Sequence, residues 1–328
     1  WQCHGSVVKV MENGRPDPST WPNTGIGRIN PDGSKGSCSA CHSRHRFSLV
    51  VSRQPDSCGK CHMGPDHPQK EIYEESKHGI AFKAFKEDMR LDAQPWRAGI
   101  EYSAAPTCAT CHMSATEELP VTHDVGTRIS WNLRPPISEK IDAKAIKAGE
   151  QVVPWEERRK KMKVVCKKCH AENYVNGFYL QFDSAINLYN EKFGKPATSI
   201  IKMMKAGGVL TATNFDEELE WTYFYLWHHE GRRARHGAAM MAPDYTQWHG
   251  FFEVAERFYI HFVPQVREAC EDKIRHGGEA ATAAKEVLAE LDSILNREEH
   301  MWFLGKMTGD EKARRKLAAE EFKKRYAQ

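Results

Sequence analysis

Eight of the ten cysteines in this chain occur in four copies of the pattern Cys-x-x-Cys-His. The four copies are Cys38/Cys41/His42, Cys58/Cys61/His62, Cys108/Cys111/His112 and Cys166/Cys169/His170. This spacing is that of c-type haem attachment, in which two thiols add to the two vinyl groups of one porphyrin and the adjacent histidine ligates the iron. The pattern therefore predicts four covalently bound haems, each with its own proximal histidine.

Zinc binding, thiol redox chemistry and disulfide bonds each explain fewer features of these motifs than haem attachment does. Four Cys-x-x-Cys pairs could build two tetrahedral zinc sites, but the histidine in every copy would then have no role. A thioredoxin-like redox pair would be single and would follow a βαβ pattern, which the sequence lacks. A disulfide scaffold is implausible at this length and cysteine density. A zinc scaffold stays as an alternative, and it would give a colourless protein.

The first residues carry one more fragment of the pattern. A cysteine before Trp1 would complete a fifth motif with Cys3 and His4, so we expect that the sequence begins inside a haem site and that an N-terminal part is missing. A lone Cys-His dipeptide is the alternative. Cys270 has no such neighbour and lies in a helical pattern, which indicates an ordinary buried thiol.

The chain holds 16 histidines, many more than the five expected proximal ligands. A haem that only carries electrons needs a second axial ligand, so a surplus is expected. We expect distal ligation at three histidines: His78, His123 and His236. Ligation and an ordinary surface or core role are equally open for three others: His45, His229 and His249. We expect the last three to face solvent or protein: His261, His276 and His300.

Helical periodicity is weak before about residue 130, where Gly, Pro and Ser are frequent, and it strengthens after about residue 141. Helices are expected near 71–86, 153–170, 183–206, 215–241, 244–274 and 278–304. We therefore expect a mainly α protein. A haem-packed multihaem c-type domain would cover 1–180, and a long-helix C-terminal bundle would cover 181–328.

Composition excludes several other classes. The formal net charge is only +3 and the basic residues are scattered, which argues against a nucleic-acid partner. No run of 18 apolar residues occurs, so no transmembrane helix is expected. Apolar residues make up only 40% of the chain, which suits a core partly filled by non-protein groups. Thioether haem attachment takes place outside the cytoplasm, so a periplasmic or other extracytoplasmic location is expected.

Five segments of the chain resemble the octahaem hydroxylamine oxidoreductases. They are 58–69, 75–79, 106–116, 121–126 and 227–250, the first reading CGKCHMGPDHPQ and the last WHHEGRRARHGAAMMAPDYTQWHG. The resemblance implies eight haems in the full protein, of which this segment would hold the fourth to the eighth. It also implies a homotrimer that oxidises hydroxylamine to nitric oxide or nitrite and passes the electrons to a small cytochrome.

The resemblance also implies roles for particular residues. Cys3 and His4 would hold the catalytic haem, and Asp66-His67 would be the catalytic pair on its distal side. Tyr102 would be a further distal residue. Tyr245 would be bonded covalently to the catalytic porphyrin of a neighbouring subunit. The alternatives are a Pro-flanked turn for Asp66-His67 and a helix-start aromatic packed in the bundle for Tyr245.

These roles agree with the chemistry of the residues. Oxidation of a small nitrogen compound releases protons, which a histidine with a near-neutral pKa can accept and which a carboxylate beside it can stabilise. A tyrosine bonded to the ring would distort the macrocycle and so tune the haem. Arginines 232, 233 and 235 either partner haem propionates or form a solvated helix face.

Four functions therefore stay in view. The first is hydroxylamine oxidation, and a hydrazine-oxidising enzyme is a close variant of it. A nitrite-reducing enzyme of the same architecture is the second class. A non-enzymatic multihaem electron carrier is the third, and a zinc scaffold is the fourth.

Overall fold

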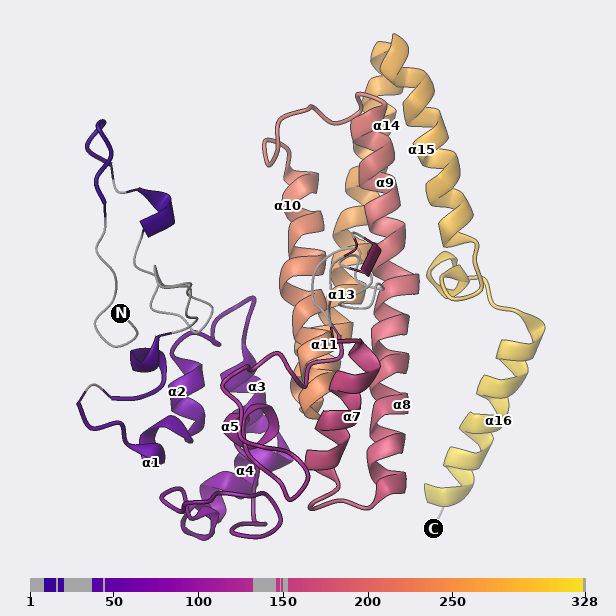
Figure 1. Cartoon of the computed structure of the whole chain (residues 1–328). Helices are drawn as coiled ribbons and strands as arrows, with labels where there is room; N and C mark the ends of the chain where they lie inside the picture. Colours follow the sequence, from indigo (N-terminus) through magenta and orange to yellow (C-terminus); the bar gives the residue numbers. More distant parts are fainter. Residues whose placement is uncertain are drawn as a thin grey trace. The chain divides into compact units, whose positions relative to one another are not determined.

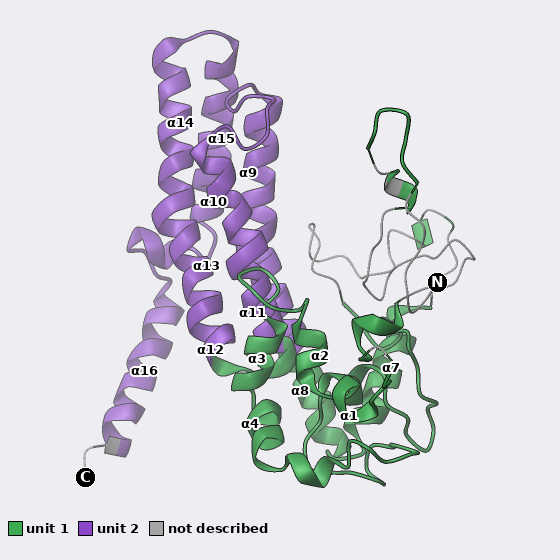
Figure 2. Ribbon diagram, turned by 90° about the vertical axis from the view of Figure 1, so that its left-hand side faces the viewer, with its two compact units in different colours: residues 1–132, 139–181, 239–243 green, residues 133–138, 182–238, 244–328 purple. Residues whose placement is uncertain are grey.

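The computed structural model describes residues 9–15, 17–20, 37–43, 45–131, 146–147, 149 and 153–326 (Figure 1). The mainly α fold class expected from the sequence is confirmed. Across the described ranges no strand forms, and Arg97 and Ala98 make isolated β-bridges with Ala115 and Tyr102 respectively. The chain divides into two units, coloured separately in Figure 2: unit 1 is 1–132, 139–181 and 239–243, and unit 2 is 133–138, 182–238 and 244–328.

Unit 1 is built from short helices joined by long irregular segments. Its helices are α1 (Leu49–Ser52), α2 (Pro55–Gly59), α3 (Gln69–Glu75), α4 (Lys77–Ala84), α5 (Cys108–His112) and α7 (Trp155–Cys166), with 3-10 turns η1 (Pro18–Thr20), η2 (Cys38–Ala40) and η3 (Lys86–Met89). The first ten residues of α8 (Glu172–Tyr189) also belong to this unit. Its apolar cluster has only nine buried members, centred on Tyr73, Trp96 and Tyr102.

The helix expected over 71–86 is interrupted. Ser76 adopts extended backbone angles, ends α3 and caps α4, because its hydroxyl accepts a hydrogen bond from Gly79 N at 3.1 Å. A Cβ on Gly79 would lie 1.9 Å from the carbonyl oxygen of Tyr73. Only glycine fits this junction, which brings the two helices close together just beside His78.

Unit 2 contains long helical runs that continue through π-helical segments. The first run is α8, η4 (Asn190–Gly194) and α9 (Lys195–Ala206); the second is α10 (Glu218–Tyr225), η5 (Leu226–Glu230) and α11 (Gly231–Met240); the third is α12 (Pro243–Thr246), η6 (Gln247–Phe252), α13 (Glu253–Glu256), η7 (Arg257–Phe262) and α14 (Val263–His276). They are followed by α15 (Glu279–Leu295), η8 (Met301–Leu304) and α16 (Gly309–Tyr326). Four expected helices are confirmed here, but the one expected from 183 already begins at Glu172 and the one expected to reach 304 ends at Leu295.

Apolar packing holds unit 2 together. Helices α9, α14 and α15 lie side by side in both views (Figures 1 and 2). Twenty-two buried residues form one cluster, with Phe258, Phe262 and Leu291 completely enclosed. Cys270 is a member with no exposed surface, so its interpretation as a buried thiol is confirmed.

The π-helical segments carry most of the histidines of this unit. Segment η5 holds His228 and His229, η6 holds His249, and η7 holds His261. A π segment inserts one extra residue into a helix and locally widens it, and such insertions are frequent at functional sites.

Candidate haem sites and catalytic residues

Each of the four complete Cys-x-x-Cys-His motifs forms a single helical turn in unit 1. The histidine N–H donates to the carbonyl of the first cysteine at 2.8 Å in the motif ending at His42, and at 3.0 Å in those ending at His62 and His170. The motif ending at His112 is helix α5 itself. Side chains three residues apart on such a turn lie on one side, so both thiols can reach one porphyrin edge. The partial motif at Cys3 and His4 lies outside the described residues.

A capping box starts the turn of the third motif. The Thr107 hydroxyl accepts from Thr110 N, and the Thr110 hydroxyl accepts from Thr107 N at 3.0 Å. This reciprocal cap fixes the first turn of α5 and therefore the direction of the Cys108 and Cys111 side chains.

The motifs follow one another in space in chain order. Cys41 lies near Cys58 and Cys61, and the Cys58 thiol is in hydrogen-bonding contact with that of Cys108. Cys111 in turn lies near both cysteines of the last motif. Porphyrins attached at these positions would therefore be neighbours, as rapid electron transfer between haems requires.

A zinc scaffold does not fit this arrangement. In the described part of the chain, only one set of three metal-ligating groups lies close together, and it consists of the carboxylates of Asp216, Glu217 and Glu220. No set of thiolates and imidazoles surrounds a common point there, as a structural zinc ion would require.

The rings of His78 and His170 lie at the separation expected of two imidazoles that share one metal. Their ring centroids are 6.1 Å apart. With metal–nitrogen bonds of about 2 Å on each side, two imidazoles that share one metal have centroids about 6 Å apart. Tyr174 stacks on the ring of His170 with a centroid distance of 4.7 Å. This pair fits a six-coordinate haem attached at Cys166 and Cys169.

His42 and His123 lie near enough to interact electrostatically. Burial lowers the pKa of His42, and the charge of His123 lowers it further. Neutral imidazole is the form that binds a metal. The loop that carries His123 comes 81 residues after His42, and periodicity gave no indication of this pairing.

His112 is oriented by a backbone carbonyl. Its Nδ1 lies 3.2 Å from the carbonyl oxygen of Val125, which leaves Nε2 for iron, a common outer-sphere arrangement of metal-binding histidines. Arg128 holds the end of the same turn, donating to the carbonyls of Cys111 at 3.1 Å and Ser114 at 2.6 Å. The roles of Val125 and Arg128 were not predicted, because a backbone carbonyl and a single arginine in a loop form no recognisable sequence motif.

Asp66 and His67 form a close pair five residues beyond His62. The Asp66 carboxylate lies 2.7 Å from His67 Nδ1, and both side chains are partly exposed. The loop that carries them is held at Gly64, whose N–H donates to the Glu71 carboxylate at 3.0 Å. Gly64 has a φ of 95°, which favours glycine.

Tyr102 lies in the apolar cluster of unit 1. Its ring stacks on Trp96 with a centroid distance of 4.2 Å, and its hydroxyl lies 2.8 Å from the Ser114 hydroxyl. Burial raises the pKa of Tyr102 to about 12, although the hydrogen bond to Ser114 lowers it. The structure therefore gives Tyr102 a packing role, and its catalytic role stays a prediction.

Tyr245 is positioned by two close backbone approaches. A Cβ on Gly237 would lie 2.7 Å from the carbonyl carbon of Tyr245, and one on Gly250 would lie 2.3 Å from its carbonyl oxygen. These glycines let α12 and η6 pack directly against α11. The ring of His249 lies 5.6 Å from that of Tyr245, between centroids.

The other candidate distal ligands have varied surroundings. His249 Nδ1 lies 2.9 Å from the Glu253 carboxylate, and its Nε2 lies 3.5 Å from Asp244. His229 packs 4.9 Å from Tyr225 between ring centroids, and His236 is buried on α11. His45 has a left-handed backbone, with a φ of 66°. Iron ligation by these four stays a prediction.

The arginines of α11 differ in exposure. Arg232 and Arg235 are buried, at 9% and 0% exposure, so a solvated helix face is wrong for these two. Arg233 lies nearer the surface, where its guanidinium pairs with the Glu253 carboxylate. The same charges looked alike in the sequence because helical spacing does not say which face of a helix is covered.

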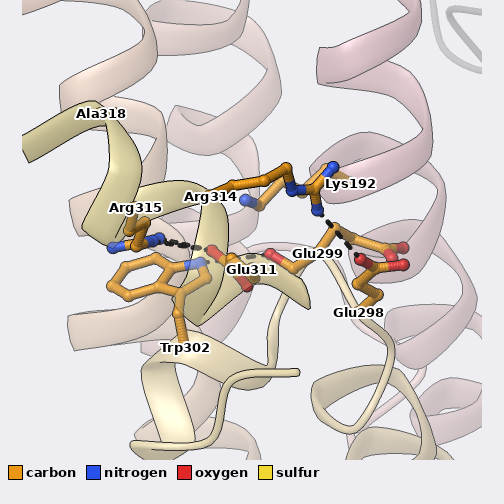
Figure 3. Close-up of a pocket in the computed structure, with 8 residues that line it drawn as sticks. All are labelled: Lys192, Glu298, Glu299, Trp302, Glu311, Arg314, Arg315 and Ala318. Carbon is orange, nitrogen blue, oxygen red and sulfur yellow. Dashed lines mark hydrogen bonds and ion pairs between the residues drawn. The ribbon is translucent and has the colours of Figure 1, made fainter. Parts of the chain in front are cut away.

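A large open pocket lies elsewhere, within unit 2. It has a volume of about 720 Å³ and is lined by Lys192, Glu298, Glu299, Trp302, Glu311, Arg314, Arg315 and Ala318 (Figure 3). Opposite charges pair in it: Arg315 lies 2.6 Å from Glu311 one turn away on α16, and Arg314 lies 3.8 Å from Glu298. None of the predicted site residues lines this pocket, and its charges already neutralise one another, so it is not the candidate site.

Four haem-attachment turns in a helical chain, with imidazoles at axial separation, define a multihaem c-type cytochrome whose haems carry electrons. Known proteins place the chain within this class. It belongs to the family described as "Seven times multi-haem cytochrome CxxCH", whose profile matches residues 31–217.

One curated relative is the "Probable nitrite reductase-hydroxylamine oxidoreductase fusion protein" of Kuenenia stuttgartiensis. It is 30% identical over 212 residues, which are 53% of this chain. The match spans only 25% of that relative's length. The family that is shown, a multihaem cytochrome family, is coarser than the octahaem enzyme family named from the sequence.

Two solved structures share the fold. One is a "Hypothetical multiheme protein", with a TM-score of 0.64 at 25% identity over 84% of this chain and 68% of that one. The other is the reducing HAO-like protein complex of Kuenenia stuttgartiensis, with a TM-score of 0.54 at 21% identity over 80% of this chain and 61% of that one. Among the described helices, none combines the length and apolar character needed to span a bilayer.

Proposed function

We propose that this chain is part of an oxidoreductase that oxidises hydroxylamine to nitric oxide or nitrite and passes the electrons through bis-histidine haems to a small cytochrome. The observation that carries the proposal is the Asp66–His67 pair, with Nδ1 and carboxylate oxygen 2.7 Å apart. An oriented, partly exposed imidazole beside a haem-attachment turn is suited to accept protons from a small substrate.

The four complete motifs and the Cys3-His4 fragment would hold five haems in this segment, and eight in the full protein. Haem supplies reversible one-electron chemistry at iron when bound. His78 would be the second ligand opposite His170, and His123 the second ligand opposite His42, which their proximity supports.

Proton removal would fall to His67. Asp66 holds Nδ1, so the ring nitrogen that does not face Asp66 would receive the substrate proton. The carboxylate would then stabilise the imidazolium, as the acid of a catalytic triad does. Tyr102 is proposed as a further residue on this side, although its hydroxyl already contacts Ser114.

Tyr245 would be bonded to the catalytic porphyrin of a second copy of this chain, in a homotrimer. Its half-buried position and the close packing at Gly237 and Gly250 support a fixed placement of its backbone. Trp248 and Phe252, 63% and 55% exposed on the same run, offer apolar surface for such an assembly.

Steady-state oxidation of hydroxylamine and of hydrazine by the purified holoprotein tests the proposal. We expect turnover with at least one of them, and a haem peptide whose mass includes Tyr245. His67→Gln should lower kcat by about 10²–10⁴-fold, as loss of a general base does. His276→Gln is the matched control, because His276 is exposed. Equal turnover by His67→Gln and the control would contradict the proton-accepting role.

Nitrite reduction is the second candidate function. It is favoured by the names of the relatives, one a probable nitrite reductase fusion and the other a reducing complex. It predicts nitrite-dependent oxidation of a reduced viologen and a haem peptide without Tyr245. A non-enzymatic electron carrier predicts neither activity. In each case an extracytoplasmic location is proposed, as is typical of multihaem c-type cytochromes.

A further inference from the structure

Tyr174 stacks on the ring of one proximal histidine. It lies four residues after His170, in the first turn of α8, and the two rings have 4.7 Å between centroids and 20° between planes. The backbone bond from Val175 N to the Ala171 carbonyl, 3.1 Å long, shows that a helical turn already joins the two positions. Residues four apart on a helix share one face, so the spacing itself brings the tyrosine against the imidazole.

The other three complete motifs have no aromatic residue at this position. The residues four beyond their histidines are Arg46, Asp66 and Thr116. The ring of His112 is oriented in another way, by the 3.2 Å contact of its Nδ1 with the Val125 carbonyl. The last motif is therefore distinguished by the aromatic side chain that its sequence places four residues after the proximal histidine.

The hydroxyl of Tyr174 is in contact with Met241. It lies 3.9 Å from the Met241 sulfur. Met241 has a left-handed backbone, with a φ of 56°, which is unfavourable for a residue with a long side chain and is kept only where the surrounding structure requires it. Both residues belong to unit 1, as do His78 and His170. Because Tyr174 is 47% exposed, these two contacts do more than enclosure to hold its ring.

A stacked ring can fix the direction of an axial ligand. The planes of His78 and His170 make an angle of 44°. A ligating imidazole can rotate about its bond to the metal, and the groups around it set its orientation. Such a rotation would turn the face of the imidazole away from the Tyr174 ring, so the stacked contact opposes it.

We propose that Tyr174 is a positioning residue for the haem of the last motif. Its ring fixes the plane of His170 relative to that of His78, and thereby the ligand field at the iron. This inference rests on the haem content in the proposed function and on the pairing of these two histidines, and not on the substrate.

Electron paramagnetic resonance of the ferric holoprotein, recorded without substrate, tests this role. A protein tunes a haem through its axial ligands, and in low-spin ferric haems the largest g value rises as the two imidazole planes approach the perpendicular. Tyr174→Leu should therefore shift the largest g value of one haem. Tyr174→Phe keeps the stacked ring and should leave that signal in place. Leu180→Ala is the control, because Leu180 is 71% exposed on the same helix.

Haem content, measured by the pyridine haemochrome method, has to be equal in the variants that are compared. A Tyr174→Leu spectrum equal to that of the native protein would overturn the proposal. An equal shift in Tyr174→Phe would also overturn it, because the hydroxyl rather than the stacked ring would then be responsible. If Tyr174→Leu does not retain its haem, Met241→Ala decides. That variant leaves the ring but removes its second contact, so the same signal should broaden or move, and an unchanged signal would count against the proposal.

The outcome is separate from that of the activity measurements. A protein that carries its haems and shows the expected shift, but does not oxidise hydroxylamine or hydrazine, would contradict the proposed reaction and leave the role of Tyr174 standing.

Discussion

The two units differ in the contacts that stabilise each of them internally. Counted over the described residues alone, unit 2 encloses 22 apolar residues in one cluster, whereas the cluster of unit 1 has nine. In unit 1, three arginines instead hold irregular segments in place by donating hydrogen bonds to backbone carbonyls. Arg53 donates to Leu91 and Ala93, Arg128 to Cys111 and Ser114, and Arg158 to Ile129 and Val153. A unit with so little apolar core is expected to depend on its haems for the remainder.

The largest effect should follow from removing one haem of unit 1. In a Cys108→Ala/Cys111→Ala variant, amides of 45–131 should lose most of their protection in hydrogen-exchange mass spectrometry, because a porphyrin-sized part of the core is absent. Amides of 253–295 in unit 2 should stay protected, since their helices bury their own apolar faces.

A Cys270→Ala variant is the matched control, because it removes a buried thiol from unit 2 without touching a haem motif. Native-like protection across 45–131 in the double variant would show that unit 1 is stable without that haem. The contrast between the two units would then be wrong.

The same contrast explains what could be predicted from sequence. The helices after residue 153 were predictable because apolar periodicity alone determines them, and the four attachment motifs were predictable because thioether chemistry fixes their spacing. The interruption of the helix at Ser76 could not be predicted, because it depends on the close approach of Gly79 to the backbone of Tyr73. Pairing of His78 with His170 was also beyond the sequence, since loops bring together residues 92 positions apart.

Other expectations lie beyond what the structure tests. The assignment of 1–180 and 181–328 as domains stays a prediction, as do the catalytic roles of Asp66, His67, Tyr102 and Tyr245. The sequence left the exposure of Arg235 open between a partner of haem propionates and a solvated helix face. The burial of this side chain, with its guanidinium over the Tyr189 ring, excludes the solvated face.

A smaller effect, specific to unit 2, concerns pH. His300 has no exposed surface, and burial among Phe258 and Tyr259 lowers its pKa to about 4. The charges of Lys192 and Arg297 lower it too, whereas Glu299 and a backbone hydrogen bond with Lys192 oppose the shift. The unfolded chain binds a proton near pH 6.5, whereas the folded chain does not until about pH 4. Stability should therefore be full above pH 6.5 and fall by at most about 3 kcal/mol as the pH drops to 4.

Denaturant unfolding followed by circular dichroism between pH 7 and 4 would measure this slope. His300→Gln should reduce the dependence of the unfolding free energy on pH, and it should also remove the 2.8 Å contact with the Tyr259 hydroxyl. His276→Gln should leave it unchanged, because that side chain is 74% exposed. An equal slope in the native protein and in His300→Gln would mean that other groups cause it.

The last prediction concerns the arginines of unit 1 that donate to backbone carbonyls. Arg128→Met keeps an unbranched side chain but leaves the carbonyls of Cys111 and Ser114 without their donor. Each such loss costs about 1–3 kcal/mol, so the thermal transition of unit 1 should move to lower temperature while that of unit 2 does not. Lys60→Gln, at an exposed position, removes the same charge and should have little effect. Arg128→Lys should recover only part of the loss, because one ammonium cannot reach both carbonyls in the geometry of the guanidinium fork. Full recovery by lysine would show that charge alone, rather than the two-pronged contact with backbone oxygens, holds the turn that carries His112.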